Sequence, residues 1–318
     1  FSTERNVHRF YVSMPYGYFV DLQVCGDMEA KLALPRCSAG DIVALTGASI
    51  QGSGHFERDD LDAAFEEDVL TIWPMVSCNP RAWGEFVAWL QAACAGTTMG
   101  TLAITAQKHI RTARSQLRYT PGILEKLAAI GLLARYESWG DTVEITFKSP
   151  LIKKCLLNQG IWLELYGYVL ASRSGCFDDV KTSVVVDWDG ADSGPDSTKN
   201  EVDIFLIKGV VPVFISCKMG VPTALALSEI KLLTEKFGGG LAQAVMLTAE
   251  TLGKEHRALR GRAADLGITM VDGAMLKNDL LLNKLDAAAS GERLHRRQHP
   301  GTHTGSLPLQ GSRSRAFL

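Results

Sequence analysis

Residues 199–218 read KNEVDIFLIKGVVPVFISCK, and this stretch decides the fold of the chain around it. Two apolar runs flank a Lys208–Gly209 turn, as in two strands joined by a tight connection. With a four-residue turn that begins at Lys208, Asp203 lies opposite Ser216 and shares a face with Lys218. A carboxylate and a lysine at neighbouring strand ends, both bordered by core residues, are typical of a functional site.

The segments on both sides of this hairpin alternate between helix and strand patterns. An apolar helix is expected over residues 156–172, before the hairpin. After the hairpin we expect a helix at 224–237, a strand at 244–248, a helix at 255–266 and a strand at 268–271. This order predicts an α/β sandwich with the hairpin in its sheet.

Glu164 is the one charged residue in the predicted helix LLNQGIWLELYGYVLAS, residues 156–172. A carboxylate on a buried helix face costs several kcal/mol unless a cation, a metal ion or hydrogen bonds meet it. Glu164 therefore either takes part in a site or points to solvent, where Arg173 is a possible partner.

These motifs together resemble the PD-(D/E)XK nuclease superfamily. The resemblance rests on the order of helix Glu164, the NEVD segment and the FISCK segment, and on the Phe237-Gly238-Gly239 turn that follows. More closely, the chain resembles the CRISPR-associated endonucleases that cyclic oligoadenylate activates, whose chains begin with a CARF domain. The fold class that this implies is a restriction-endonuclease-like α/β core, preceded by a winged-helix-like segment and a partial N-terminal domain.

The resemblance also implies an active site and its cofactor. Asp203 would hold Mg²⁺ or Mn²⁺ with Glu164 nearby, and the carbonyl of Cys217 would face the metal. Lys218 would polarise the attacking water or the scissile phosphate. This assignment agrees with general chemistry, because hard cations take oxygen ligands and a lysine can offset charge on a phosphate. The family further implies a homodimer that cleaves DNA or RNA in type III CRISPR antiviral defence.

Two features depart from the family pattern. Ser216 occupies the position of the usual acid of the D/E-X-K motif, and Glu229 and Glu201 are the two candidates to replace it. The Gly-rich segment with which a CARF domain binds its ring nucleotide has no counterpart in residues 1–90. We therefore expect a chain that lacks most of the CARF domain and its activator pocket.

The remaining sequence predicts four regions. Residues 1–95 are expected to follow a CARF-like domain, 96–150 to form a winged-helix-like segment, 151–285 the nuclease domain, and 286–318 a disordered tail. Within the second region we expect a helix near residues 109–118, a second helix after Thr120, and a hairpin that ends near Phe147. This segment either binds DNA or serves packing and dimerisation, since its second helix offers only Lys126 as a cation.

Bulk composition limits the alternatives. Apolar content of 46% and a formal net charge of −2 indicate an ordinary globular protein with no global attraction to nucleic acid. Seven cysteines without a CxxC spacing favour a reducing compartment, and no apolar run is long enough for a membrane span. We expect a cytoplasmic metal-dependent endonuclease; the rivals are a catalytically impaired nucleic-acid-binding or assembly module of the same fold, and a resolvase-like enzyme.

Overall fold

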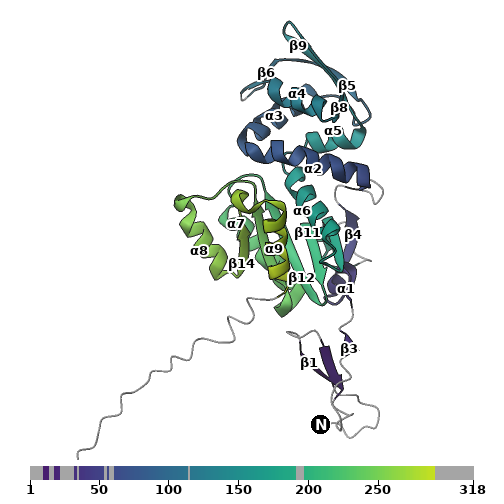
Figure 1. The fold of residues 1–318 in the computed structure, drawn as a ribbon, viewed down its shortest axis with the longest axis vertical. Helices are drawn as coiled ribbons and strands as arrows, with labels where there is room; N and C mark the ends of the chain where they lie inside the picture. The colour runs from purple at the N-terminus through teal and green to yellow at the C-terminus, as the bar shows by residue number, and fades with distance from the viewer. Residues whose placement is uncertain are drawn as a thin grey trace, which may run out of the picture.

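The computed structural model describes residues 10–13, 18–21, 32–33, 36–53, 56, 61–113, 115–190 and 197–290, the first three ranges by their backbone only. An upper group of elements, α2–α5 with β5–β9, lies against a larger lower group built around a central sheet (Figure 1). No helix in these ranges is both long and apolar enough to cross a membrane. Strands β1 (Phe10–Ser13), β2 (Tyr18–Asp21) and β3 (Leu32–Ala33) form a separate three-stranded sheet.

The central sheet has six strands in the order β14-β13-β12-β11-β10-β4. The pairs from β4 to β12 are antiparallel, and β12, β13 and β14 pair in parallel. The strands are β4 (Ser49–Ser53), β10 (Asp179–Asp187), β11 (Lys199–Lys208), β12 (Val211–Lys218), β13 (Gln243–Thr248) and β14 (Ile268–Val271). Strand β4 lies before residue 151, so the sheet extends beyond the range 151–285 predicted from the sequence.

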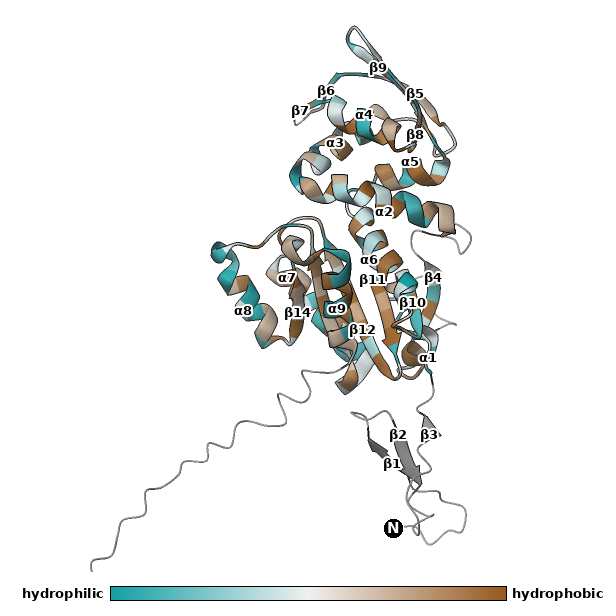
Figure 2. Ribbon diagram, viewed as in Figure 1, coloured by the Kyte–Doolittle hydropathy of each residue, from teal (hydrophilic) through white to brown (hydrophobic). Residues whose placement is uncertain are grey.

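Helices cover both faces of this sheet, which confirms the predicted α/β class. On one face, α6 (Ile161–Ser174) packs on β11 and α9 (Asn278–Ala289) packs on β12 and β13, in a core that includes Ile204 and Leu206 of β11. On the other face, α1 (Ala39–Ala44), α7 (Ala224–Gly238) and α8 (Arg257–Asp265) share a core with Phe205 and Ile207. Because both faces are buried, the central strands are apolar along most of their length (Figure 2).

The β11–β12 hairpin has the predicted register. Lys208 pairs with Val211 and Ile204 with Ile215, so Asp203 lies opposite Ser216. Gly209 begins the two-residue loop with φ of 60°, which suits the first central position of a type II′ turn. Glycine adopts this left-handed backbone without a steric penalty.

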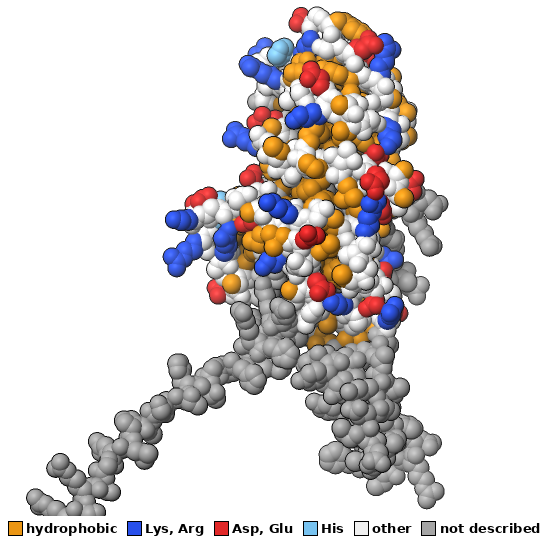
Figure 3. Space-filling view, viewed as in Figure 1, with side chains coloured by type: hydrophobic (Ala, Val, Ile, Leu, Met, Phe, Trp, Pro, Cys, Tyr) orange, Lys and Arg blue, Asp and Glu red, His pale blue; other side chains and the backbone are white. Residues whose placement is uncertain are grey.

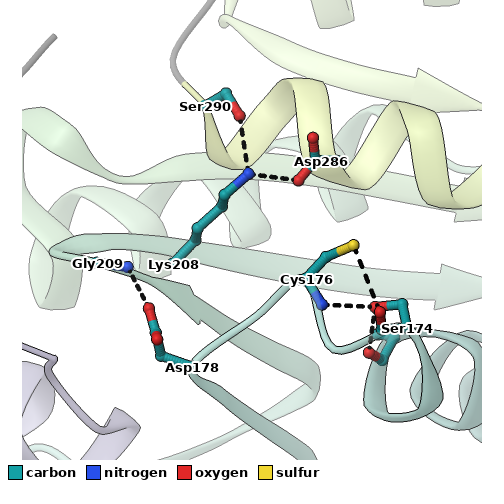
Figure 4. Close-up of polar contacts among 8 residues, drawn as sticks. Ser174, Cys176, Asp178, Lys208, Gly209, Asp286 and Ser290 are labelled. Atoms are coloured by element: carbon teal, nitrogen blue, oxygen red, sulfur yellow. Dashed lines mark hydrogen bonds and ion pairs between the residues drawn. The ribbon is translucent and has the colours of Figure 1, made fainter. Parts of the chain in front are cut away.

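Polar contacts anchor this turn to two neighbouring elements (Figure 4). The Lys208 ammonium lies 2.5 Å from Oδ1 of Asp286 on α9 and 3.2 Å from Oγ of Ser290, the residue that caps that helix. The Gly209 N–H donates to Asp178 Oδ2 at 2.6 Å, beside the start of β10. The sequence predicted that a disordered tail begins at residue 286, and this boundary is wrong because α9 continues to Ala289. Residues 291–318 of that tail lie outside the described residues.

The upper group contains helices α2 (Ala63–Cys78) and α3 (Pro80–Ala93), a three-stranded sheet, a small hairpin and two shorter helices. The sheet order is β5-β9-β8, with β5 (Ala103–Gln107), β8 (Leu133–Trp139) and β9 (Thr142–Phe147). Helix α4 (Pro121–Ala129) lies before the β8–β9 hairpin, and α5 (Pro150–Leu156) follows it. The expected helix after Thr120 and the hairpin are thus both present.

The expected helix near residues 109–118 is wrong. The structure has β6 (His109–Arg111) and β7 (Gln116–Arg118) there, paired antiparallel. Only Ile110 and Leu117 are partly buried, one at the centre of each strand. An alternation of period 2 therefore governs this segment, and no apolar stripe of helical period exists to hold a helix against the core.

Helix α6 approaches the sheet closely at Gly167, where a Cβ would lie 2.7 Å from Ile204 Cδ1. We predict that Gly167→Val lowers the free energy of unfolding by about 1–3 kcal/mol, because overpacking displaces the helix from β11. Denaturant unfolding measures this change. Gly122→Val, in a helix with open space around the glycine, is the matched control. Equal losses in the two variants would contradict the close approach.

Candidate active site

Asp203 on β11 lies beside the end of β12, where three groups meet one of its carboxylate oxygens. The Ser216 hydroxyl and the Cys217 N–H donate to Asp203 Oδ2 at 3.2 and 2.5 Å. Lys218 Nζ lies 4.0 Å from the same oxygen. The predicted meeting of Asp203 and Lys218 is therefore present in the fold. The Lys218 side chain is 43% exposed, so its ammonium is open to a ligand.

Glu164 approaches Asp203 from α6, which covers the face of the sheet opposite to α7. Its side chain is buried, and Oε1 accepts hydrogen bonds from the Thr182 hydroxyl at 2.7 Å and from the Ser183 hydroxyl. The Thr182 hydroxyl also lies 3.3 Å from the carbonyl oxygen of Asp203. Hydrogen bonds from β10 thus hold Glu164, and its suggested pairing with Arg173 is wrong. Arg173 instead pairs with Glu66 and Glu67.

Burial raises the pKa of the Glu164 carboxyl to about 8. The Ser183 and Thr182 hydroxyls act in the opposite direction, and the negative charges of Asp203 and Glu201 raise the pKa further. Without a cation nearby, this carboxyl therefore carries a proton at neutral pH.

Ser183 has an unusual backbone that explains how two adjacent hydroxyls reach one carboxyl. Its φ is 50°, and it is the only non-glycine residue with positive φ in the described part of the chain. Thr182 pairs with Ile204 and Val184 with Val202, so Ser183 faces Asp203 across the strands. In a regular strand, neighbouring side chains point to opposite faces. The left-handed turn at Ser183 breaks that alternation beside Asp203, and such strain is often found at functional sites.

Above Asp203 lies a cleft with a volume of about 250 Å³. Strands β11 and β12 contribute Glu201, Asp203, Ser216 and Lys218 to its lining, and α7 contributes Glu229. Glu201 and Glu229 are both exposed, so each carries a carboxylate at the edge of the cleft near Ser216. Glu164 does not line this cleft.

The Cys217 thiol is not suited to act as a nucleophile. Burial raises its pKa well above the ordinary value, and the negative charges of Asp203 and Glu164 add to this effect. The thiol therefore stays protonated near neutral pH, and what Cys217 provides to Asp203 is its backbone N–H.

The side chains fit a magnesium or manganese ion of the kind that keeps part of its water shell. In the described ranges, no three His, Cys, Asp or Glu side chains form a ready metal-binding group. Mg²⁺, however, is commonly bound by one or two carboxylates together with waters and substrate phosphates. Asp203, with Glu201 and Glu229 at the rim of the cleft, provides the one or two carboxylates that such an ion needs.

The sequence analysis missed Thr182 and Ser183 as residues of the site. Thr182 and Ser183 precede the apolar run of β10, and two adjacent hydroxyl residues there were the available signal. Asn200 lines the cleft, and its Oδ1 accepts a hydrogen bond from Trp188 Nε1 at 2.8 Å. Asn200 begins the NEVD segment on which the resemblance rests, but the sequence analysis assigned it no role in the site.

Comparisons with known proteins establish the fold but not a family. Protein VC1899 from Vibrio cholerae is similar with a TM-score of 0.65 and 17% identity, over 89% of this chain and 69% of that one. Can2 from Sulfobacillus thermosulfidooxidans, solved in complex with cyclic tetra-adenylate, has a TM-score of 0.52 and 16% identity, over 88% and 68%. No family model and no curated protein matches the sequence.

We predict that Glu164→Gln stabilises the metal-free protein, increasingly as the pH rises. The raised pKa means that the folded state binds this proton more tightly than the unfolded state, so the wild type loses stability as pH rises from about 4.5 through about 8. The melting temperatures of the two proteins should agree near about pH 4 and differ by several degrees near about pH 9.

Melting in EDTA across this pH range measures the difference, with Glu125→Gln, an exposed position on α4, as the control. A constant difference at all pH values would show that Glu164 does not titrate in the folded protein.

Proposed function

We propose that this chain is a metal-dependent endonuclease of the PD-(D/E)XK type that hydrolyses phosphodiester bonds of DNA or RNA. The observation that carries the proposal is the convergence of Asp203, midway along β11, with Lys218, at the end of β12, over an open cleft with Glu164 beneath. A carboxylate and an ammonium at 4.0 Å provide both a cation ligand and a partner for phosphate.

In this proposal Asp203, Glu164 and the carbonyl of Cys217 would hold Mg²⁺ or Mn²⁺. When bound, such an ion lowers the pKa of a water molecule and polarises the phosphoryl oxygen. The hydrogen bonds from Ser216 and Cys217 orient the Asp203 carboxylate toward the cleft. Glu164 must release its proton to serve as a ligand, because cation ligands bind in their deprotonated form.

Lys218 provides a positive charge that does not depend on the cofactor. Its ammonium lines the cleft beside Asp203, where the phosphate of a bound strand would lie. There it offsets the negative charge that develops on the phosphoryl oxygens during attack, and it orients the attacking water.

The likeness to solved structures also suggests a biological role and binding partners for this chain. The likeness to Can2, whose solved complex contains cyclic tetra-adenylate, agrees with the resemblance to oligoadenylate-activated CRISPR endonucleases. We therefore propose a role in CRISPR-associated defence, with a homodimer as the active form. Cyclic oligoadenylate is the activator class that the likeness to Can2 suggests. Because residues 1–90 lack the Gly-rich segment of a CARF domain, we expect calorimetry to detect no binding of cyclic tetra-adenylate to this chain.

A second candidate is a catalytically impaired nucleic-acid-binding or assembly module of the same fold. Ser216 in place of the acid favours it, because a hydroxyl supplies a dipole where the motif supplies a full charge. Cleavage of plasmid or single-stranded RNA by the wild type with Mn²⁺, and its absence in EDTA, would exclude this candidate.

We predict that Asp203→Asn and Lys218→Ala each reduce Mn²⁺-dependent cleavage to background while their melting temperatures stay near that of the wild type. Both side chains are partly exposed and lie outside the apolar cores, so folding does not require them. Lys254→Ala, an exposed lysine away from the cleft, is the matched control and should cleave normally. Loss of cooperative melting together with activity would make the two residues structural.

We predict that one carboxylate at the rim of the cleft replaces the missing acid. Either Glu201→Gln or Glu229→Gln, but not both, should lower the cleavage rate by about 10-fold or more and raise the Mn²⁺ concentration required. Ser216→Glu should be tolerated or activating, because it restores the charge beside Asp203. Wild-type rates in both single variants across metal concentrations would leave Glu164 and Asp203 as the sufficient carboxylates.

A further inference from the structure

A second groove lies in the upper group, with a volume of about 590 Å³. Helix α3 contributes Arg81 and Glu85 to its lining, and the segment from β7 to α4 contributes Arg118 and Tyr119. Gln159, in the connection between α5 and α6, completes it. Two arginines and several hydrogen-bonding side chains therefore line a groove outside the candidate active site.

Gln159 connects this groove to the active site. It also lines a cavity of about 560 Å³, together with Lys218 and Glu229. Lys218 and Glu229 in turn line the cleft above Asp203. Three hollows that share lining residues thus form one path from the upper group to the proposed catalytic residues. The Gln91 side chain steadies this junction by donating to the carbonyl of Leu157 at 2.8 Å.

The β6–β7 hairpin beside the groove presents a basic outer face. His109 pairs with Arg118 and Arg111 with Gln116, and all four residues are exposed. Residues 108–118 contain one lysine and three arginines and no acidic residue, although the whole chain has a net charge of −2. Figure 3 shows Lys and Arg side chains gathered along the upper left edge, where Figure 2 places β6, β7 and α3.

Glu85 is the one acidic residue among the described residues that line the groove. Arg81 Nε lies 3.4 Å from Glu85 Oε1, and these side chains are 87% and 69% exposed. A pair this exposed is weak, so a phosphate can compete with Glu85 for the guanidinium. Within the described ranges, Arg111 and Arg118 have no ion-pair partner.

We propose that this path binds one strand of nucleic acid. Arg81, Arg111 and Arg118 bind backbone phosphates on the upper group, and the strand runs past Gln159 to the cleft at Lys218. This inference rests on the proposed function, since it names how the substrate of that site is held.

The occupant is single-stranded because of the chemistry of the lining. Proteins that bind single strands combine a cationic groove with aromatic and hydrogen-bonding side chains. Here Tyr119 forms part of the wall, with Lys108 Nζ 5.5 Å from its ring centroid and Trp89 beside it. Gln159 provides an amide group for hydrogen bonds with bases where the groove and the cavity meet.

The test is equilibrium binding in EDTA, where no cleavage is needed, with labelled single-stranded DNA and RNA of about 16 nucleotides. The triple variant Arg81→Gln, Arg111→Gln, Arg118→Gln should bind about 10-fold more weakly or worse at about 50 mM salt. Its slope of log affinity against log salt should be smaller by about 2, since each lost phosphate contact removes about 0.7.

The matched control removes the same charge from another surface: Lys254→Gln, Arg257→Gln, Arg262→Gln, at exposed positions on and beside α8. It should bind like the wild type. Equal weakening in both triple variants, or no weakening in the first, would overturn the proposed path. Binding of duplex DNA as tight as that of single strands, with the same loss, would overturn the assignment to one strand.

Gln159→Ala tests the junction without a change of charge. It should raise KM for cleavage of the oligonucleotide more than it lowers kcat, because it acts on binding along the path. An unchanged KM would remove Gln159 from the path. A wild type that binds through the three arginines but cleaves no nucleic acid would instead refute the proposed function and leave the binding path standing.

Discussion

The left-handed backbone at Gly209 is the constraint on which the candidate site depends. This turn sets the register of β11 on β12, and the register places Asp203 beside Ser216 and Lys218. A slip of one residue would move Asp203 to the face covered by α6, because side chains alternate along a strand. The contacts with Asp178 and Asp286 hold the turn in this arrangement.

The burial of Glu164 imposes the second constraint. A carboxyl in this apolar helix needs hydrogen-bond donors, and a regular strand could offer it only one of two adjacent hydroxyls. The left-handed conformation at Ser183 lets Thr182 and Ser183 both donate to it, at a strain of about 1–3 kcal/mol. Ser183 also lies opposite Asp203. The distortion that supports the Glu164 carboxyl therefore lies next to the Asp203 carboxylate.

Much of the site could be predicted because its determinants are local in the sequence. The turn composition at Gly209 and the alternation along FISCK were sufficient to bring Asp203 to Lys218, since both rules act within one hairpin. The single charge of Glu164 in an apolar helix identified it without any knowledge of its partners. The donors Thr182 and Ser183 were missed because their role depends on a backbone distortion that adjacent residues do not encode.

The sequence by itself determined the α/β class, the hairpin register and the meeting of Asp203 with Lys218. Only the tertiary structure decided that residues 49–53 form an edge strand on β10, because such pairing joins segments far apart in the chain. Likewise, the structure showed that residues 109–118 form a hairpin with a basic outer face, because only Ile110 and Leu117 pack inward there. The path through Gln159 arises the same way, since side chains from four separate segments line it.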